Sequence, residues 1–285
     1  MTAVRPATTT LPDGRLLAWT EFGPATAAPV LFAPGAGTSS ALGFAVDRLP
    51  SLAVRLIAID RPGLGRSTPA PGRRLADFAA DVAALTAARR LGRPAMVGYS
   101  QGAPFALACA AAAVVADVAV VAGTDELAAP TVRSRLPEPV RALVEAVVDD
   151  PAAAEARFAT MTAAQLHALI AATSDPRDLA VYQAPPLAAA LRAALDEGFA
   201  QGSAGYARDA VLTMGPWGLD LAAIRTPVHL WYGAHDASPV HSPDHGATLA
   251  TRIPGARRTV VADGGGALPW THGETILAEL VGRGA

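Results

Sequence analysis

The sequence has 285 residues, of which 51% are hydrophobic and 17% are charged, with a net charge of -2. This length can bury the core of one large α/β domain or of two small ones, and the composition does not suggest a disordered chain. Without a basic excess the chain is not expected to bind nucleic acid or an anionic membrane surface. Its single cysteine, Cys109, excludes an internal disulfide framework.

The absence of two residue types limits the kinds of catalysis that the chain can perform. The sequence contains no lysine and no asparagine, which excludes Schiff-base catalysis, a P-loop lysine and a Cys-His-Asn triad. Residues 1–10 lack the apolar core of a secretory signal, so we expect a cytoplasmic protein. Residues 103–123 are almost apolar enough to span a membrane, but their many alanines and Asp117 favour a buried helix, a turn and a buried strand.

Short apolar, β-branched runs alternate with helical patterns along the chain. Residues 11–17, LPDGRLL, predict an antiparallel hairpin at the leading edge of a sheet, and residues 73–92 carry apolar side chains at helical spacing. Strands that alternate with helices of this length predict a doubly wound, mostly parallel sheet of the α/β class. The runs that suggest strands are 16–22, 28–37, 54–63, 94–100, 118–124, 227–233 and 257–265.

The alternation stops between Asp125 and Ala223. This stretch has helical patches separated by LPEP, DDP, SDP and APP, and it has no convincing strand. It predicts a helical lid inserted after the sixth strand. We therefore expect a core made of residues 1–124 and 224–285, with the lid at 125–223.

The clearest chemical motif is GYSQG, residues 98–102, which lies between an apolar strand and an alanine-rich helix. This is the context of a G-x-S-x-G nucleophile elbow, in which a strained turn presents the serine, Ser100, above the sheet. The start of the helix would direct the N–H of Gln101 towards a developing oxyanion. The Gly-rich loop 34–37 would supply the second donor, the N–H of Ala36.

With these motifs the chain resembles the α/β-hydrolase superfamily over essentially its whole length. Residues 33–37, APGAG, stand where these proteins carry an oxyanion loop, with Pro34 in place of a histidine, and residues 60–68, DRPGLGRST, resemble their D-x-x-G-x-G-x-S signature. Residues 232–240 resemble the turn that carries the triad acid, which would be Asp236. Asp125, after the preceding strand, is the alternative acid.

The resemblance implies a catalytic histidine within GGGALP, where this chain has Ala267. Loss of one triad member typically costs on the order of three to six decades of rate. His272 is one substitute base, although residues 271–274, THGE, predict a capping box that would place it on a helix surface. Alternatively, the chain has lost hydrolysis and traps its substrate, or it uses the scaffold as a cyclase, lyase or binding protein.

The remaining histidines include His241 and His245, whose spacing could suit zinc on a helix. Ser242 to Asp244 predict the start of that helix, which would leave His241 outside it, so we expect no metal site.

We expect an apolar pocket lined by Tyr99, Tyr206 and Trp217. The sequence thus predicts a serine hydrolase without a cofactor that cleaves a small apolar ester, lactone or related carbonyl compound through an acyl-enzyme, with activity impaired by Ala267. The alternative is a cofactor-free cyclase or lyase, or a small-molecule-binding protein, on the same scaffold. The oligomeric state is left open. Met161, Tyr182, Phe199, Met214 and Trp270 are further pocket candidates.

Overall fold

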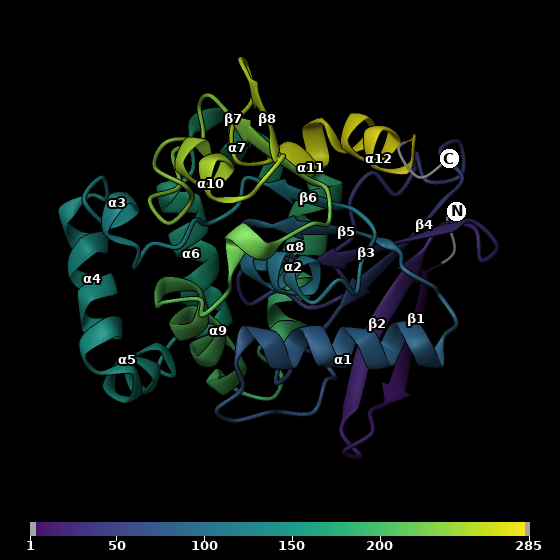
Figure 1. The fold of residues 1–285 in the computed structure, drawn as a ribbon, viewed down its shortest axis with the longest axis horizontal. Helices are drawn as coiled ribbons and strands as arrows, with labels where there is room; N and C mark the ends of the chain where they lie inside the picture. Colours follow the sequence, from purple (N-terminus) through teal and green to yellow (C-terminus); the bar gives the residue numbers. More distant parts are fainter. Residues whose placement is uncertain (1–3, 283–285) are drawn as a thin grey trace.

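The computed structural model describes residues 4–282. Within this range the chain forms an eight-stranded sheet in the order β1-β2-β4-β3-β5-β6-β7-β8 (Figure 1). The hairpin of β1 and β2 is antiparallel, β2 is antiparallel to β4, and the other neighbours are parallel, as predicted. The strands are β1 (Val4–Thr10), β2 (Leu16–Phe22), β3 (Ala28–Ala33), β4 (Val54–Ile59), β5 (Ala95–Tyr99), β6 (Val118–Val121), β7 (Val228–Gly233) and β8 (Arg257–Val261).

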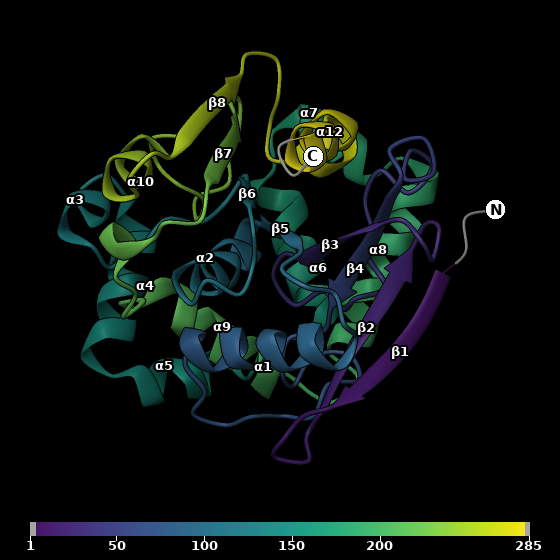
Figure 2. The same ribbon diagram turned by 45° about the vertical axis from the view of Figure 1, so that its right-hand side comes forward.

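Helices cover both faces of the sheet. On one face, α1 (Leu75–Ala88) and α2 (Ala103–Ala111) pack a buried cluster against the strands, and the apolar stripe predicted on α1 is buried there. On the other face α12 (Gly273–Gly282) buries its apolar residues against β3 to β7. Burial on both faces explains why the central strands are apolar without alternation. Figure 2 shows α1 and α2 on one side of the strands and α12 on the other.

A run of helices, here called the inserted helices, separates β6 from β7. They share a hydrophobic cluster of their own, and they bear out the helical insertion expected after the sixth strand. The exact boundaries at 125 and 223 remain a prediction. Figure 1 places α3, α4 and α5 beyond one end of the sheet. The inserted helices are α3 (Pro130–Arg133), α4 (Glu138–Asp149), α5 (Pro151–Phe158), α6 (Ala163–Thr173), α7 (Pro176–Tyr182), α8 (Pro185–Gly198) and α9 (Ala204–Met214).

Two predicted helix starts are wrong. The helix expected at Ser242 begins later, as α10 (Ala247–Arg252), because residues 242–246 form turns in which His245 and Gly246 have positive φ. The capping box expected at 271–274 does not form, since Thr271 ends the short helix α11 (Leu268–Thr271). Within residues 4–282, no helix combines the length and the apolar character that crossing a membrane requires.

Candidate active site

Ser100 stands at the bend between β5 and α2. It has a φ of 51°, a conformation that L residues rarely adopt, as expected for an elbow that projects a side chain above the sheet. The bend needs small flanking residues. A Cβ at Gly98 would lie 2.7 Å from the Cβ of Ala106, and one at Gly102 would overlap the carbonyl of Ala33. The two glycines therefore allow β5 and α2 to meet closely enough to expose Ser100 at the cavity described below.

The structure brings an imidazole to Ser100, and it belongs to His241. The Nε2 atom of His241 lies 2.8 Å from the Ser100 Oγ, and its Nδ1 lies 2.7 Å from Oδ2 of Asp236. The side chains of His241 and Asp236 are 9% and 3% exposed, so the pair is largely shielded from solvent. Hydroxyl, imidazole and carboxylate thus form one chain of hydrogen bonds, with the acid on the imidazole nitrogen that faces away from the serine.

The loop after β7 carries both the acid and the imidazole. Asp236 Oδ1 accepts the N–H of Ser238 at 3.1 Å, and the N–H of His241 donates to the Ser238 carbonyl at 3.2 Å, which folds the loop back on itself. The residues that follow β6 hold this loop from the other side. The Thr124 hydroxyl donates to the Val240 carbonyl at 2.6 Å, so one neighbour of His241 is fixed by the adjacent strand end.

The sequence predicts His241 only as a discounted metal ligand, and the structure corrects that interpretation. The signal that could have found it is its place five residues after Asp236, in a loop at the carboxyl end of the parallel strands. The expected helix start at Ser242 obscures the turn that brings His241 inward. The suggested substitute, His272, is not brought to Ser100, because it follows the end of α11 and its Nδ1 lies 2.9 Å from the Thr271 hydroxyl.

Ala267, where the resemblance places the histidine, is fully buried at the start of α11. Its N–H and that of Gly266 donate to the carboxylate of Asp178 on α7, at 2.9 and 2.7 Å. Burial raises the pKa of the Asp178 carboxyl, and the nearby Asp236 charge adds to this effect. The loop that would otherwise supply an imidazole therefore binds a side chain of the inserted helices.

Asp125, the alternative acid, lies away from the imidazole. Its carboxylate accepts the N–H of Glu126 at 2.7 Å and faces Ser242 and Arg252. Burial raises its pKa to about 6.

A cavity of about 170 Å³ opens beside the Ser100 hydroxyl. Ala36 and Gln101, the residues expected to supply oxyanion donors, line it together with Ser100 and His241. The other lining residues are mostly aliphatic or aromatic, and those among the described residues include no Asp, Glu or Arg. Such a cavity suits an uncharged, mostly apolar ligand.

Aromatic side chains close one side of the cavity. The hydroxyls of Tyr99 and Tyr182 are 2.8 Å apart, and the ring of Trp270 packs edge-on against both. Of the other two residues expected in the pocket, Tyr206 lines this cavity and Trp217 does not. Trp217 instead packs in the core beside α2, with its indole N–H on the Thr213 carbonyl, because the chain after α9 turns back towards the sheet.

Of the other residues expected in the pocket, some line the cavity and some do not. Met214 lines the cavity with Tyr182 and Trp270, whereas Met161 and Phe199 pack within the inserted helices. Among the described residues, no group of three or more His, Cys, Asp or Glu side chains is placed to hold a metal ion.

Comparison with known proteins identifies the family of the chain. The sequence profile of the alpha/beta hydrolase family matches residues 30–279. The chain belongs to this family. A search among curated proteins found no match.

Solved structures of the alpha/beta hydrolase fold align with almost the entire chain. The enol-lactonase from Burkholderia xenovorans is 19% identical with a TM-score of 0.68, and the alignment covers 97% of this chain and 98% of that one. An esterase from Rhodococcus is 21% identical with a TM-score of 0.65, covering 98% of each chain. A bromoperoxidase from Bacillus anthracis is 18% identical with a TM-score of 0.71, covering 99% and 98%. At these identities the likeness establishes the fold.

In this alpha/beta hydrolase the signature at residues 60–68 ties loops together below the site. The Asp60 carboxylate accepts the backbone N–H groups of Ser40 and Arg66, and the Ser67 hydroxyl bonds both the Asp60 carbonyl and the N–H of Ala18. The motif therefore holds neighbouring loops together, and none of its residues lines the cavity.

Proposed function

We propose that the chain is a serine hydrolase that cleaves small, uncharged esters or lactones through an acyl-enzyme. The observation that carries this proposal is the hydrogen-bonded chain from Ser100 through His241 to Asp236, which is the arrangement that activates a serine nucleophile. Because the imidazole comes from another loop, Ala267 no longer argues for impaired hydrolysis. The cyclase, lyase and binding alternatives have no comparable observation in their favour.

Each step follows from the positions of these groups. The Ser100 hydroxyl attacks the carbonyl carbon as its proton passes to Nε2 of His241, and Asp236 stabilises the imidazolium that forms. The N–H groups of Ala36 and Gln101 would bind the oxyanion. The imidazolium then gives its proton to the departing alkoxide, which leaves an acyl-Ser100 ester. A water, deprotonated by His241, attacks that ester and releases the acid.

The cavity supports the substrate class. An engineered apolar cavity of about 150 Å³ binds benzene, and the cavity beside Ser100 is of about 170 Å³. A short acyl group or a small lactone ring fits this space, and the lack of a charged lining side chain disfavours ionic substrates. We propose that the inserted helices act as a lid over this cavity, because α6, α8 and α9 supply part of its wall.

The test is hydrolysis of p-nitrophenyl butyrate by the native chain and by Ser100→Ala, with a fluorophosphonate to label the nucleophile. We expect turnover that Ser100→Ala abolishes, and a single adduct on Ser100 by mass spectrometry. Absence of both turnover and labelling in the folded native chain would refute the proposal. Tight binding of an apolar ester without turnover would support a binding protein instead.

A further inference from the structure

Arg61 is the largest of the fully buried side chains, and it lies directly behind the proposed active site. It follows β4 in the signature loop, and its charge is taken up by four hydrogen bonds. Its Nε donates to Oδ2 of Asp209 at 2.6 Å, and its terminal nitrogens donate to three oxygens near the cavity. Burying a guanidinium costs free energy unless its donors have well-positioned acceptors, so these partners must be held in place.

Two of those oxygens are the carbonyls of Pro34 and Gly35, at 2.6 and 3.0 Å. Both peptides are trans, so the C=O and N–H of each peptide plane point in opposite directions. When Arg61 binds the Gly35 carbonyl, the N–H of Ala36 in the same plane must point away from Arg61. No described residue accepts a backbone hydrogen bond from this N–H, which leaves it as a donor beside the cavity.

The third oxygen is Oε1 of Gln101, 3.3 Å from the guanidinium. Gln101 provides the other proposed oxyanion donor through its backbone N–H, and its amide nitrogen lies 3.4 Å from the Thr213 hydroxyl of α9. A single guanidinium therefore binds the Gly35 carbonyl, in the peptide that carries the Ala36 N–H, and the side chain of Gln101. It binds the peptide of one donor and the side chain of the other.

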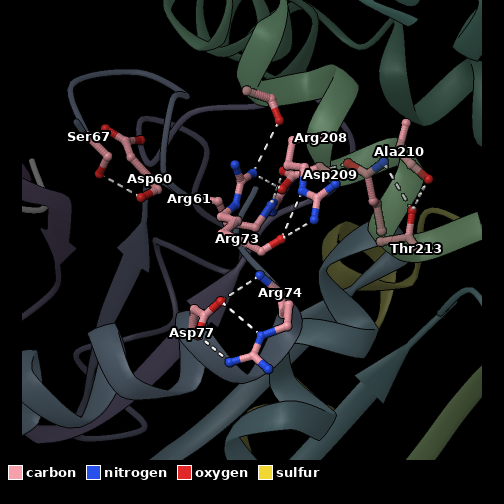
Figure 3. A network of polar contacts seen from close by, with 12 residues as sticks. Asp60, Arg61, Ser67, Arg73, Arg74, Asp77, Arg208, Asp209, Ala210 and Thr213 are labelled. Carbon is pink, nitrogen blue, oxygen red and sulfur yellow. Dashed lines mark hydrogen bonds and ion pairs between the residues drawn. The ribbon is translucent and has the colours of Figure 1, made fainter. Parts of the chain in front are cut away.

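An inserted helix holds Arg61 in place. Asp209 of α9 is fully buried and binds Arg61 through one oxygen and Arg73 through the other, as Figure 3 shows. The backbone of α9 reaches the signature loop closely, since a Cβ at Gly63 would lie 2.9 Å from the Cα of Gly205. The Arg73 guanidinium donates to two groups of α9, the Asp209 carboxylate and the Gly205 carbonyl, and to no group of the oxyanion loop among the described residues.

We propose that Arg61 is a positioning residue that sets the orientation of the oxyanion donors, and that Asp209 of the inserted helices fixes Arg61 for this role. The inference rests on the proposed function. It assigns to α9 a part in transition-state stabilisation besides lining the cavity. It also separates Arg61 from Arg73, which shares the same carboxylate but does not touch the oxyanion loop.

The test compares Arg61→Lys with the matched control Arg73→Lys. Lysine keeps the charge but cannot donate in a fixed fork to Asp209 and the loop carbonyls at once. A misplacement of about 1 Å in a catalytic group can cost roughly 100-fold in rate. We therefore expect Arg61→Lys to lower kcat by about 100-fold, with KM changed by less than about threefold. Arg73→Lys should lose thermal stability but retain kcat.

A trifluoromethyl ketone adds a second measurement, because its adduct with Ser100 places a negative oxygen where the oxyanion forms. Its affinity should fall for Arg61→Lys in proportion to kcat/KM and stay unchanged for Arg73→Lys. Equal loss of kcat in both variants would reduce Arg61 to a structural role and overturn the proposal. Native kcat in a folded Arg61→Lys would also overturn it. Arg61→Gln serves as the second variant if the lysine variant does not fold.

Crystal structures of the Arg61 and Arg73 variants keep this inference distinct from the proposed function. If the folded native chain neither hydrolyses esters nor reacts with a fluorophosphonate, the proposed function alone is refuted. The orientation of the Gly35–Ala36 peptide still decides the positioning role. We expect this peptide to rotate in the Arg61 variant and to stay unchanged in the Arg73 variant, and an unchanged peptide in both would overturn the inference.

Discussion

The carboxylate of Asp178 accepts the N–H of Ala267 at 2.9 Å, so a side chain of α7 is bound at the loop where the resemblance to hydrolases implies a histidine. Gly266 donates to the same carboxylate. This loop is thereby a docking point for an inserted helix. The arrangement is compatible with hydrolysis because His241 reaches Ser100 from elsewhere.

Replacing Ala267 by histidine is therefore expected to harm the protein and not to activate it. Ala267 is 0% exposed, and a larger side chain in a packed core typically costs about 1–3 kcal/mol. We expect Ala267→His to show no gain in kcat for p-nitrophenyl butyrate and to melt several degrees lower than the native chain. Ala189→His, at an exposed site on α8, is the control. A large gain in kcat for Ala267→His would contradict the proposed role of His241.

His241→Ala should abolish hydrolysis. In a serine protease, loss of the triad histidine lowers kcat by roughly a million-fold, and we expect a fall of at least about four decades here. His272→Ala is the matched control and should retain full activity, since its imidazole contacts Thr271 and not Ser100. Rates of ester hydrolysis, measured for two variants with matching melting temperatures, test this prediction. Equal activity of the two variants would exclude His241 as the base.

The buried Asp125 carboxyl should make the stability of the folded chain depend on pH. Burial raises its pKa to about 6 from 3.8, so the folded state disfavours the ionised form relative to the unfolded chain. The stability contributed by the protonated carboxyl is present below the unfolded pKa and is lost as the pH rises through about 6. Asp125→Asn cannot ionise, and its melting temperature relative to the native chain should rise from about pH 4 to about pH 8.

Thermal unfolding at both pH values measures this difference. Asp149→Asn, at an exposed position on α4, is the control for the loss of one carboxylate. A difference between Asp125→Asn and the native chain that does not change with pH would show that burial does not penalise the Asp125 charge.

Leu191 should set the length of the acyl chain that the cavity accepts. This residue of α8 lines the cavity and is 5% exposed. Removal of its branched end would make room for about two methylene groups, each contributing roughly 0.8 kcal/mol when buried, which together correspond to about tenfold in kcat/KM. Leu191→Ala should therefore raise the ratio of kcat/KM for octanoyl over acetyl p-nitrophenyl esters by about that factor.

Leu187→Ala controls for a general loosening of the same helix. Leu187 packs in the cluster of the inserted helices but does not line the cavity, so its truncation should leave the acyl-chain preference unchanged. The same shift in both variants would mean that the cavity wall at Leu191 does not determine specificity.

The sequence predicts the sheet, the helical insertion and the place of Ser100 because these depend on local patterns. Apolar strands, an amphipathic helix and a Gly-flanked serine are each legible within a few residues. The partner of Ser100 is not legible in this way. His241 is 141 positions away from Ser100. Its approach depends on the turns after Asp236 and on the hydrogen bond from Thr124, and neither produces a periodic pattern in the sequence.

The position of Trp217 is also not predicted from the sequence. Trp217 follows a helix that lines the cavity, and a large aromatic residue there suggests a ligand contact. The same size and apolarity suit the core beside α2, where Trp217 packs. Residue type alone does not decide between the two, because core and pocket walls are built from the same side chains.

Asp236 and His241 belong to one continuous segment of six residues. The hydrogen bond between them therefore depends on the length of this one loop, and an inserted residue between them would pull the carboxylate and the imidazole apart. The histidine that follows the last strand is His272, which contacts Thr271, whereas the imidazole beside Ser100 lies in the loop of the acid. In other chains that have alanine at the position of Ala267, the residues just after the acid are the place to look for an imidazole.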